Sequence, residues 1–158
     1  MDKKKLTKGE IKFSALQFLK SQNTMVLASI SNNLESEAAT VYFVPDENFN
    51  LYFMTSAKSR KAENLRINGK VAFVAGWGPE VITIQGGGLA KELEPKEAET
   101  FYALIKKTAI RSSSQWPVLQ LAKQGYSTFK ITPSWMVYLN MEKEKHPEIA
   151  SSEFYKII

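Results

Sequence analysis

The sequence predicts a mainly β protein, an antiparallel barrel of six or seven strands with flanking helices packed outside it. Short apolar runs rich in Val, Ile, Phe and Tyr recur along the chain, with polar turn residues between them. Apolar residues at helical spacing occur in only a few segments. The chain has 158 residues and shows neither an internal repeat nor a linker, so residues 1–158 are expected to form one domain.

The N-terminal part predicts an amphipathic helix over residues 8–21. Thr7 and Glu10 fit a capping box, in which each side chain binds the other residue's backbone N–H. Apolar residues follow at helical spacing, namely Ile11, Ala15, Phe18 and Leu19. Three strands separated by polar turns are expected next, over residues 24–30, 37–44 and 51–55.

The middle of the chain predicts a short helix followed by two strands. The helix should begin near Ser59 and end at Asn68-Gly69, a pair that commonly stops helices. The strands are expected over residues 70–75 and 80–94, joined by a turn that contains Trp77. The triplet Gly86-Gly87-Gly88 in the second strand indicates a bulge or a corner of the barrel.

The last third predicts a helix over residues 96–107 and a helical turn over residues 118–123. Two final strands are expected over residues 126–131 and 135–140, separated by Thr132-Pro133. The tail after residue 140 is charged, and no element is expected there.

A cluster of cations at the start of the expected short helix is the most unusual feature. Lys58, Arg60 and Lys61 lie where the helix already carries partial positive charge and where acidic residues are preferred. A bound phosphate would explain them, because backbone N–H groups, hydroxyls and a forked Arg side chain can hold it together. The alternative is that these side chains simply extend into water, as most surface charges do.

Composition excludes several classes of protein. The chain lacks cysteine, which excludes disulfides and thiol catalysis, and it has no apolar run long enough to cross a membrane. The first residues, MDKKKLTKGE, lack the apolar core of a signal peptide, so a cytoplasmic location is expected. No metal-ligand spacing and no Ser-His-acid motif is visible, and the Gly triplet lacks the lysine of a phosphate-binding loop.

The segment LYFMTSAKSRKAENLRINGKVAF, residues 51–73, resembles the FMN-binding split-barrel family, whose best-known members are the pyridoxamine 5'-phosphate oxidases. That family has a strand ending in Thr, then Ser-Arg-Lys, then Asn-Leu and an apolar strand. The matching residues here are Thr55, Ser59, Arg60, Lys61, Asn64 and Leu65. The runs AATVYFV and VITIQGGGLAKELEP also resemble family strands, and the likeness covers roughly residues 10–140.

The resemblance implies a split β-barrel that forms a homodimer, with FMN in clefts at the subunit interface. Arg60 and Lys61 would hold the FMN phosphate, with further donors from Thr55, Ser56 and Ser59. The isoalloxazine ring would be lined by Ala39, Thr40, Val41 and Tyr42. Gln85 is a candidate donor to a flavin carbonyl, although it could equally face solvent from its strand. Trp77 is a candidate lid over the flavin, although a turn Trp that packs on the dimer surface is the simpler interpretation.

The likeness also implies an oxidoreductase in which flavin N5 exchanges hydride with a nicotinamide or another small organic donor. Pyridoxamine 5'-phosphate oxidases carry an Arg-x-His motif near the C-terminus that grips the substrate. The corresponding strands here read TFKITPSWMVYLNM and contain neither residue type. A substrate other than pyridoxamine phosphate is therefore expected. The residues leave open which small molecule it is, and whether the protein is catalytic.

Three alternatives stay open at this point. The split barrel could use a deazaflavin, or haem with His146 as the iron ligand, although a lone His among charged residues usually lies in solvent. A different function would be single-stranded nucleic acid binding, but a net charge of +5 is weak for that role. Its stacking platforms would be Tyr42, Phe43, Tyr52 and Phe53. Arg111-Ser112-Ser113-Ser114 could bind a second anion, and Trp116 and Trp135 are expected to be core or interface anchors.

Overall fold

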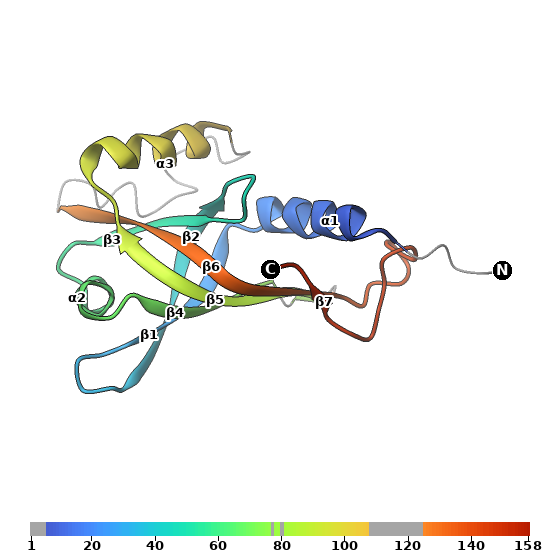
Figure 1. The fold of residues 1–158 in the computed structure, drawn as a ribbon, viewed down its shortest axis with the longest axis horizontal. Helices are drawn as coiled ribbons and strands as arrows, with labels where there is room; N and C mark the ends of the chain where they lie inside the picture. The colour runs from blue at the N-terminus through green and yellow to red at the C-terminus, as the bar shows by residue number, and fades with distance from the viewer. Residues whose placement is uncertain (1–5, 77, 80, 108–124) are drawn as a thin grey trace.

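The computed structural model describes residues 6–76, 78–79, 81–107 and 125–158 (Figure 1). Its strands form one antiparallel sheet in the order β3-β2-β1-β4-β5-β6-β7, and β3 also pairs with β6. That additional pairing closes the first six strands into a barrel, and β7 extends the sheet beyond it. The strands are β1 Thr24–Ile30, β2 Ser36–Pro45, β3 Leu51–Ser56, β4 Lys70–Gly76, β5 Ile82–Glu92, β6 Tyr126–Asn140 and β7 Tyr155–Lys156.

Three helices pack against the outside of the barrel, namely α1 Lys8–Ser21, α2 Arg60–Ile67 and α3 Pro95–Lys107. Figure 1 shows α1 and α3 over the same side of the strands, with α2 at the opposite end of the molecule from α1. The expected capping box at Thr7 and Glu10 is present, with both reciprocal bonds formed. The apolar side of α1 buries Ala15 and Leu19 against the barrel.

The core consists of the inward side chains of the strands. Phe53 of β3 and Phe129 of β6 are direct partners across the closing pair, and their rings stack with centroids 5.4 Å apart. Both rings are fully buried, as is Phe43 on the neighbouring strand β2. Burial of three large aromatic side chains at the closure contributes several kcal/mol, at roughly 1.5–3 kcal/mol for each.

The predicted fold class, a mainly β barrel with flanking helices, is confirmed. The expected strands from residue 24 to residue 94 and the three main helices are all present, with ends that agree within two residues. The helical turn expected over residues 118–123 lies outside the described residues, as do Trp77, Arg111 and Trp116.

The prediction of two separate strands at the end of the barrel is wrong. Residues 126–140 form one continuous strand, β6, and Pro133 lies at the place where the register between β5 and β6 shifts. The shift falls between Gly87 and Gly88, which confirms the expected bulge. A proline is tolerated at a bulge because the ladder hydrogen bonding is already interrupted there. Strand β7 was not expected either, and it pairs with Val137 and Tyr138.

We predict that Gly88→Ala destabilises the protein by about 2 kcal/mol or more, within the usual range for overpacking. A Cβ at this position would lie 2.2 Å from the carbonyl oxygen of Thr132 and 2.7 Å from Cα of Pro133. Neither backbone atom can move without distorting the bulge. Urea unfolding would measure the change.

The matched control is Gly78→Ala, because a Cβ at Gly78 meets nothing within 4 Å. Equal unfolding free energies for the two variants would contradict the close approach of β5 and β6 at the bulge.

Candidate functional site

The turn between β3 and α2 positions the cluster of cations. Ser59 is the N-cap of α2, with extended backbone, and its hydroxyl accepts a hydrogen bond of 3.2 Å from the Ala62 N–H. The hydroxyl of Thr55, at the end of β3, lies 3.2 Å from the same oxygen. The backbone N–H groups of Arg60 and Lys61 have no acceptor among the described residues. The turn therefore presents unpaired donors at the positive end of a helix.

These donors border a small pocket of about 200 Å³, which we call the α2 pocket. It is lined by Leu27, Ser29, Glu37, Ala38, Ala39, Ser59, Arg60 and Lys61. The structure thus brings together four of the residues singled out in the sequence, namely Ala39, Ser59, Arg60 and Lys61. Thr55 contacts this group only through Ser59, and Ser56 does not line the pocket.

The two cations of the α2 pocket differ in their surroundings. Lys61 is about half buried, and this desolvation lowers the pKa of its ammonium group. No carboxylate of the described residues forms an ion pair with it. The Arg60 side chain is 85% exposed, and its Nη1 lies 3.8 Å from Oε1 of Glu37. A partly desolvated cation without a partner favours an anion beside it.

Three residues of this region were not among the predicted site residues, although Asn64 belongs to the matched motif. Asn64 on α2 is buried, and its Nδ2 donates to Oε2 of Glu37 at 3.1 Å and lies 3.5 Å from Oγ of Ser29. Ser29 of β1 and Glu37 of β2 are direct partners across the strand pair. They are far from α2 in the sequence, so only strand register could have revealed them. Asn64, however, lies within the matched motif, and it reaches the pocket only through its contacts with Glu37 and Ser29.

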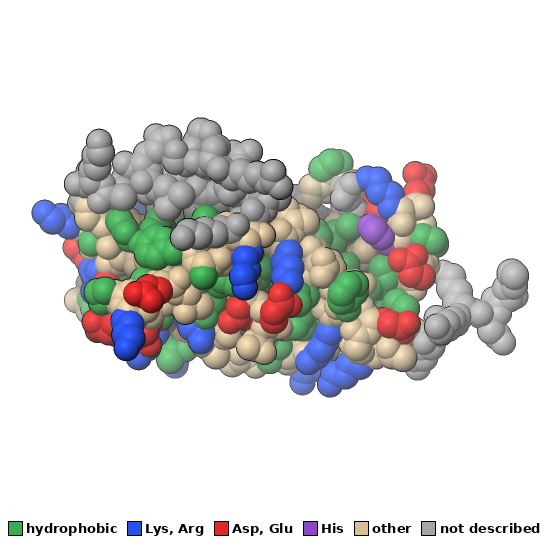
Figure 2. All heavy atoms as spheres, turned by 90° about the horizontal axis from the view of Figure 1, so that it is seen from above, with side chains coloured by type: hydrophobic (Ala, Val, Ile, Leu, Met, Phe, Trp, Pro, Cys, Tyr) green, Lys and Arg blue, Asp and Glu red, His purple; other side chains and the backbone are tan. Residues whose placement is uncertain are grey.

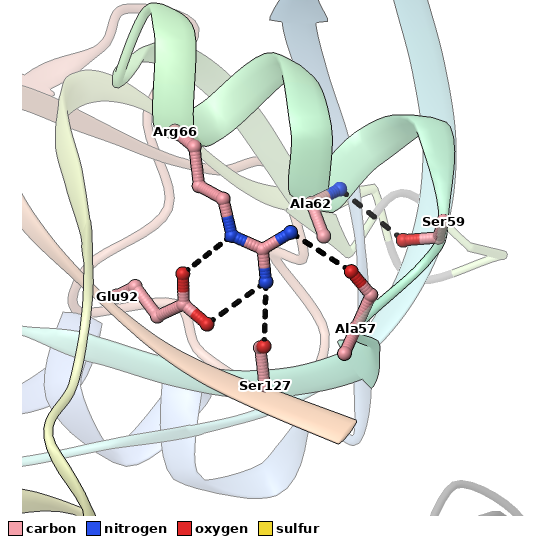
Figure 3. Close-up of polar contacts among 6 residues, drawn as sticks. All are labelled: Ala57, Ser59, Ala62, Arg66, Glu92 and Ser127. Atoms are coloured by element: carbon pink, nitrogen blue, oxygen red, sulfur yellow. Dashed lines mark hydrogen bonds and ion pairs between the residues drawn. The ribbon is translucent and has the colours of Figure 1, made fainter. Parts of the chain in front are cut away.

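Arg66, in the last turn of α2, anchors the helix to the barrel (Figure 3). Its Nε and Nη2 donate to both oxygens of Glu92 at 2.6 and 2.9 Å. Nη2 also donates to Ser127 Oγ at 2.8 Å, and Nη1 donates to the Ala57 carbonyl at 2.8 Å. One guanidinium therefore ties the turn before α2 to β5 and β6. The bond with Arg66 is also the main reason that the pKa of Glu92 is lowered.

The residues expected to line a flavin ring alternate across β2. Val41 is buried in the core, whereas Thr40 is exposed on the outer face of the sheet. Thr40 borders a second pocket, of about 300 Å³, together with Thr24, Val26 and Val74. Ala39 belongs to the α2 pocket instead. Because the Val41 side chain is buried in the core, only backbone atoms of Val41 could contact a ligand.

The outer face of the barrel carries an apolar surface. Side chains of five neighbouring strands, β2, β1, β4, β5 and β6, lie side by side on this face in two rows, because residues paired directly across strands point to the same face. Trp135 lies over Gly87, where a Cβ would be 2.5 Å from its Nε1. We call the surface formed by both rows the outer patch, and it consists of Ala38, Ala28, Ala72, Gly87 and Trp135 in one row, and Thr40, Val26, Val74, Gln85 and Val137 in the other.

The patch decides two of the sequence-based expectations. Trp135 was expected to be a core or an interface anchor. It is 45% exposed, which excludes the core role and leaves the interface role as a prediction. Gln85 lies on the outer face beside Val74 and does not line the α2 pocket. Tyr42 is partly buried and is the direct partner of Thr24, one row beyond the second row of the patch.

The remaining candidates receive less support. Phe43, Tyr52 and Phe53 are buried, so these aromatic rings are not available for stacking on nucleic acid bases. Figure 2 shows acidic and basic side chains intermixed on the face that it presents.

Among the described residues, no group of three His, Asp or Glu side chains could hold a metal ion. None of their helices is long and apolar enough to cross a bilayer.

Comparisons with known proteins agree with this architecture. A model of the pyridoxamine 5'-phosphate oxidase family matches residues 13–140. A search of curated proteins finds no match.

Three solved structures illustrate the range of similar folds. General Stress Protein 26 from Bacillus anthracis str. Sterne has 21% identity and a TM-score of 0.63, over 93% of this chain and 98% of its own. A putative pyridoxamine 5'-phosphate oxidase from Listeria innocua has 22% identity and a TM-score of 0.63, over 82% and 98%. The heme storage protein HutZ from Vibrio cholerae has 18% identity and a TM-score of 0.61, over 80% and 89%. At these identities the likeness shows a shared fold.

We predict that Arg66→Ala destabilises the protein by about 1–3 kcal/mol at neutral pH, because it removes charge-assisted hydrogen bonds that hold the α2 turn. The pKa of Glu92 is lowered in the folded state, so its contribution is complete above the ordinary carboxyl pKa and is lost as pH falls through the lower folded value. The difference in unfolding free energy between the two proteins should therefore shrink below about pH 4.

Urea unfolding at a series of pH values measures this difference. Arg60→Ala is the control, because the Arg60 guanidinium is 85% exposed and should leave stability nearly unchanged. A gap between wild type and Arg66→Ala that stays constant down to pH 2 would contradict the role of the Arg66–Glu92 pair.

Proposed function

Because this chain belongs to the pyridoxamine 5'-phosphate oxidase family, we propose that it binds FMN, with the FMN phosphate in the α2 pocket. The observation that carries the proposal is Lys61, a half-buried cation without a carboxylate partner among the described residues. It lies beside two backbone N–H groups that also lack acceptors there. A phosphate would pair with all three donors at once.

The chemistry of the lining residues fits a phosphate ester. Arg60 and Lys61 would hold the phosphate oxygens, and the Ser59 hydroxyl adds a further donor at the helix start. Glu37 is the one acidic residue lining the pocket, and Asn64 holds its carboxylate at the β2 side. The formal charge of the lining residues is therefore +1. An exposed Arg60 can turn from Glu37 to the phosphate at little cost.

The flavin ring would lie along the β1–β2 pair, toward Thr40 and Val26. Ala38 of the α2 pocket and Thr40 of the second pocket are two residues apart on β2 and lie on the same face of the sheet, about 7 Å apart. An extended ligand with an anionic end and a planar apolar end suits that separation. Residues 39–42 pair with β1 but precede the pairing of β2 with β3, which begins at Phe43, so the other side of this backbone would bind the polar edge of the flavin.

We propose further that a second copy of the chain covers the outer patch and completes the cofactor cleft. Val26, Val74 and Trp135 are 47%, 38% and 45% exposed. Small side chains at Ala28, Ala72 and Gly87 make the surface between them flat. Exposed apolar surfaces of this kind mark protein interfaces. The α2 pocket reaches Ala38, at the edge of the outer patch, so a partner there would also exclude water from the cofactor.

The proposed activity is an oxidoreductase of the cytoplasm acting on a small organic substrate. Bound FMN would supply hydride transfer, and the protein would bind, orient and desolvate it. Strand β6 has no Arg and no His that could grip pyridoxamine phosphate in the manner of the true oxidases. The substrate is therefore proposed to differ from pyridoxamine phosphate, and no residue is assigned a catalytic role.

We predict that Arg60→Ala combined with Lys61→Ala weakens FMN binding by at least about 100-fold, because two charge-assisted contacts are lost. The visible spectrum of the purified protein, followed by titration with FMN, measures this. The wild type should show flavin absorption or take up FMN. The control is Lys58→Ala combined with Lys70→Ala, which removes the same charge away from the pocket and should retain binding.

Stoichiometric flavin in the Arg60/Lys61 double variant would refute the phosphate assignment. A wild-type protein with a Soret band would indicate haem instead. A colourless protein that takes up a deazaflavin but ignores FMN would assign that cofactor to the site.

We predict that the protein is a dimer in solution and that Val74→Lys converts it to a monomer. A lysine in the middle of the outer patch would have to be buried without a partner. Light scattering after size-exclusion chromatography measures the mass. Ile67→Lys on α2 is the control, because Ile67 is 62% exposed and lies outside the patch. A monomeric wild type would reject the interface.

A further inference from the structure

A second pocket, which the proposed function does not use, lies between α1, the end of β6 and the segment that follows β6. We call it the α1 pocket, and its volume is about 350 Å³. It shares no lining residue with the α2 pocket. Its main walls are Phe13, Phe18, Tyr138, Asn140, His146 and Ile149. Apolar walls with a few convergent polar groups are typical of small-molecule sites of this volume.

Aromatic side chains form two sides of the α1 pocket. The rings of Phe18 and Tyr138 are 6.1 Å apart at their centroids and tilted by 41°. Phe13, one helical turn before Gln17, is 65% exposed, which leaves a large apolar ring against water at the pocket mouth. A planar ligand between Phe13 and Phe18 would cover that surface and make favourable ring contacts.

The α1 pocket also contains a buried donor whose proton has no acceptor. Tyr138 is 2% exposed, and its hydroxyl accepts a hydrogen bond of 3.1 Å from Asn140 Nδ2. Among the described residues, nothing accepts the proton of this hydroxyl. Asn140 Oδ1 is already occupied, since it accepts from the Glu142 N–H at 2.9 Å. Buried polar groups normally have partners, so the free O–H indicates a ligand acceptor.

Burial also keeps this donor in its protonated form. Desolvation is the main cause that raises the pKa of Tyr138 above the ordinary tyrosine value. The phenol therefore remains an O–H donor at neutral pH. A ligand group placed beside it must accept a hydrogen bond, as a carbonyl oxygen does.

The charges around the α1 pocket select against an anion. None of its lining residues is Lys or Arg. At the rim, His146 is half exposed, with its Nδ1 3.9 Å from Oε1 of Glu148. The turn that carries this ring is held in place, because the His146 N–H donates to the Glu142 carbonyl at 3.0 Å. A carboxylate ligand would meet the Glu148 charge without a compensating cation, whereas a neutral carbonyl would not.

We propose that the α1 pocket is a second ligand site, which takes a small, uncharged aromatic compound that bears a carbonyl group. Its ring lies between Phe13 and Phe18, and its carbonyl oxygen accepts the hydrogen bond from Tyr138. An aromatic amide is the simplest compound of this class.

The test uses 4-fluorobenzamide as the probe, titrated into the full chain and followed by NMR. His146 is the single histidine of the sequence, so its imidazole proton signals report on the pocket without assignment of other residues. We expect saturable shifts of these signals together with broadening of the probe's fluorine line. 4-Fluorobenzoate should bind at least about tenfold more weakly, because of its charge.

Three variants assign the contacts. Tyr138→Phe removes only the hydroxyl and should weaken the probe about fivefold to tenfold. Tyr155→Phe is the matched control, because that hydroxyl donates to the Ile149 carbonyl at 3.2 Å and does not line the pocket. Phe13→Ala should also weaken binding, and it removes an exposed side chain, so folding should be unaffected.

Several results would overturn the proposal. One is the absence of saturable shifts of the His146 signals up to the solubility limit of 4-fluorobenzamide. The others are equal affinities for 4-fluorobenzamide and 4-fluorobenzoate, and an unchanged affinity for 4-fluorobenzamide in Phe13→Ala. The Arg60/Lys61 double variant should bind the probe as the wild type does. This site and the proposed FMN site can therefore fail independently.

Discussion

Closure of the sheet by pairing of β3 with β6 is the constraint on which the rest of the structure depends. It joins Ser56 to Tyr126 at one end and stacks Phe53 on Phe129 in the core. The closing pair brings the turn after β3 beside Ser127, where Arg66 can bind both. The start of α2 is therefore positioned by the barrel and does not depend on the helix alone, which is too short to be stable in isolation.

The barrel holds two cations, Arg60 and the half-buried Lys61, beside each other in the α2 pocket. Burial of Lys61 beside unpaired N–H groups is unfavourable without a ligand, and the barrel supplies the free energy that keeps it there. Glu37 offsets part of this charge while Asn64 restrains it. The same helix carries Arg66, whose acidic partner is satisfied within the protein. Two arginines six residues apart thus have different surroundings, since Arg66 is bonded to Glu92 and Arg60 is largely exposed, 3.8 Å from Glu37.

Under the two proposals, anion binding and aromatic binding occur at separate pockets. The α2 pocket has cations and donors at the start of α2, and Figure 1 shows α2 at the opposite end of the molecule from α1. The α1 pocket has aromatic walls and the buried Tyr138 hydroxyl, whose proton has no acceptor among the described residues, and none of its lining residues is Lys or Arg. The two pockets share no lining residue, so the two proposed ligands would not compete for the same atoms.

The sequence by itself determined the limits of the strands from residue 24 to residue 94 and of the three helices, the bulge at Gly87 and Gly88, and the cations before α2, because these are local patterns of burial, turn residues and charge. It did not reveal that Pro133 lies within a continuous β6, since the missing hydrogen bond is tolerated only opposite the bulge. The tertiary structure alone decided that Glu37 and Ser29 join Lys61, and that Tyr138 and His146 share a pocket. Those contacts depend on strand register and barrel closure, which are long-range and leave no periodic signal in the chain.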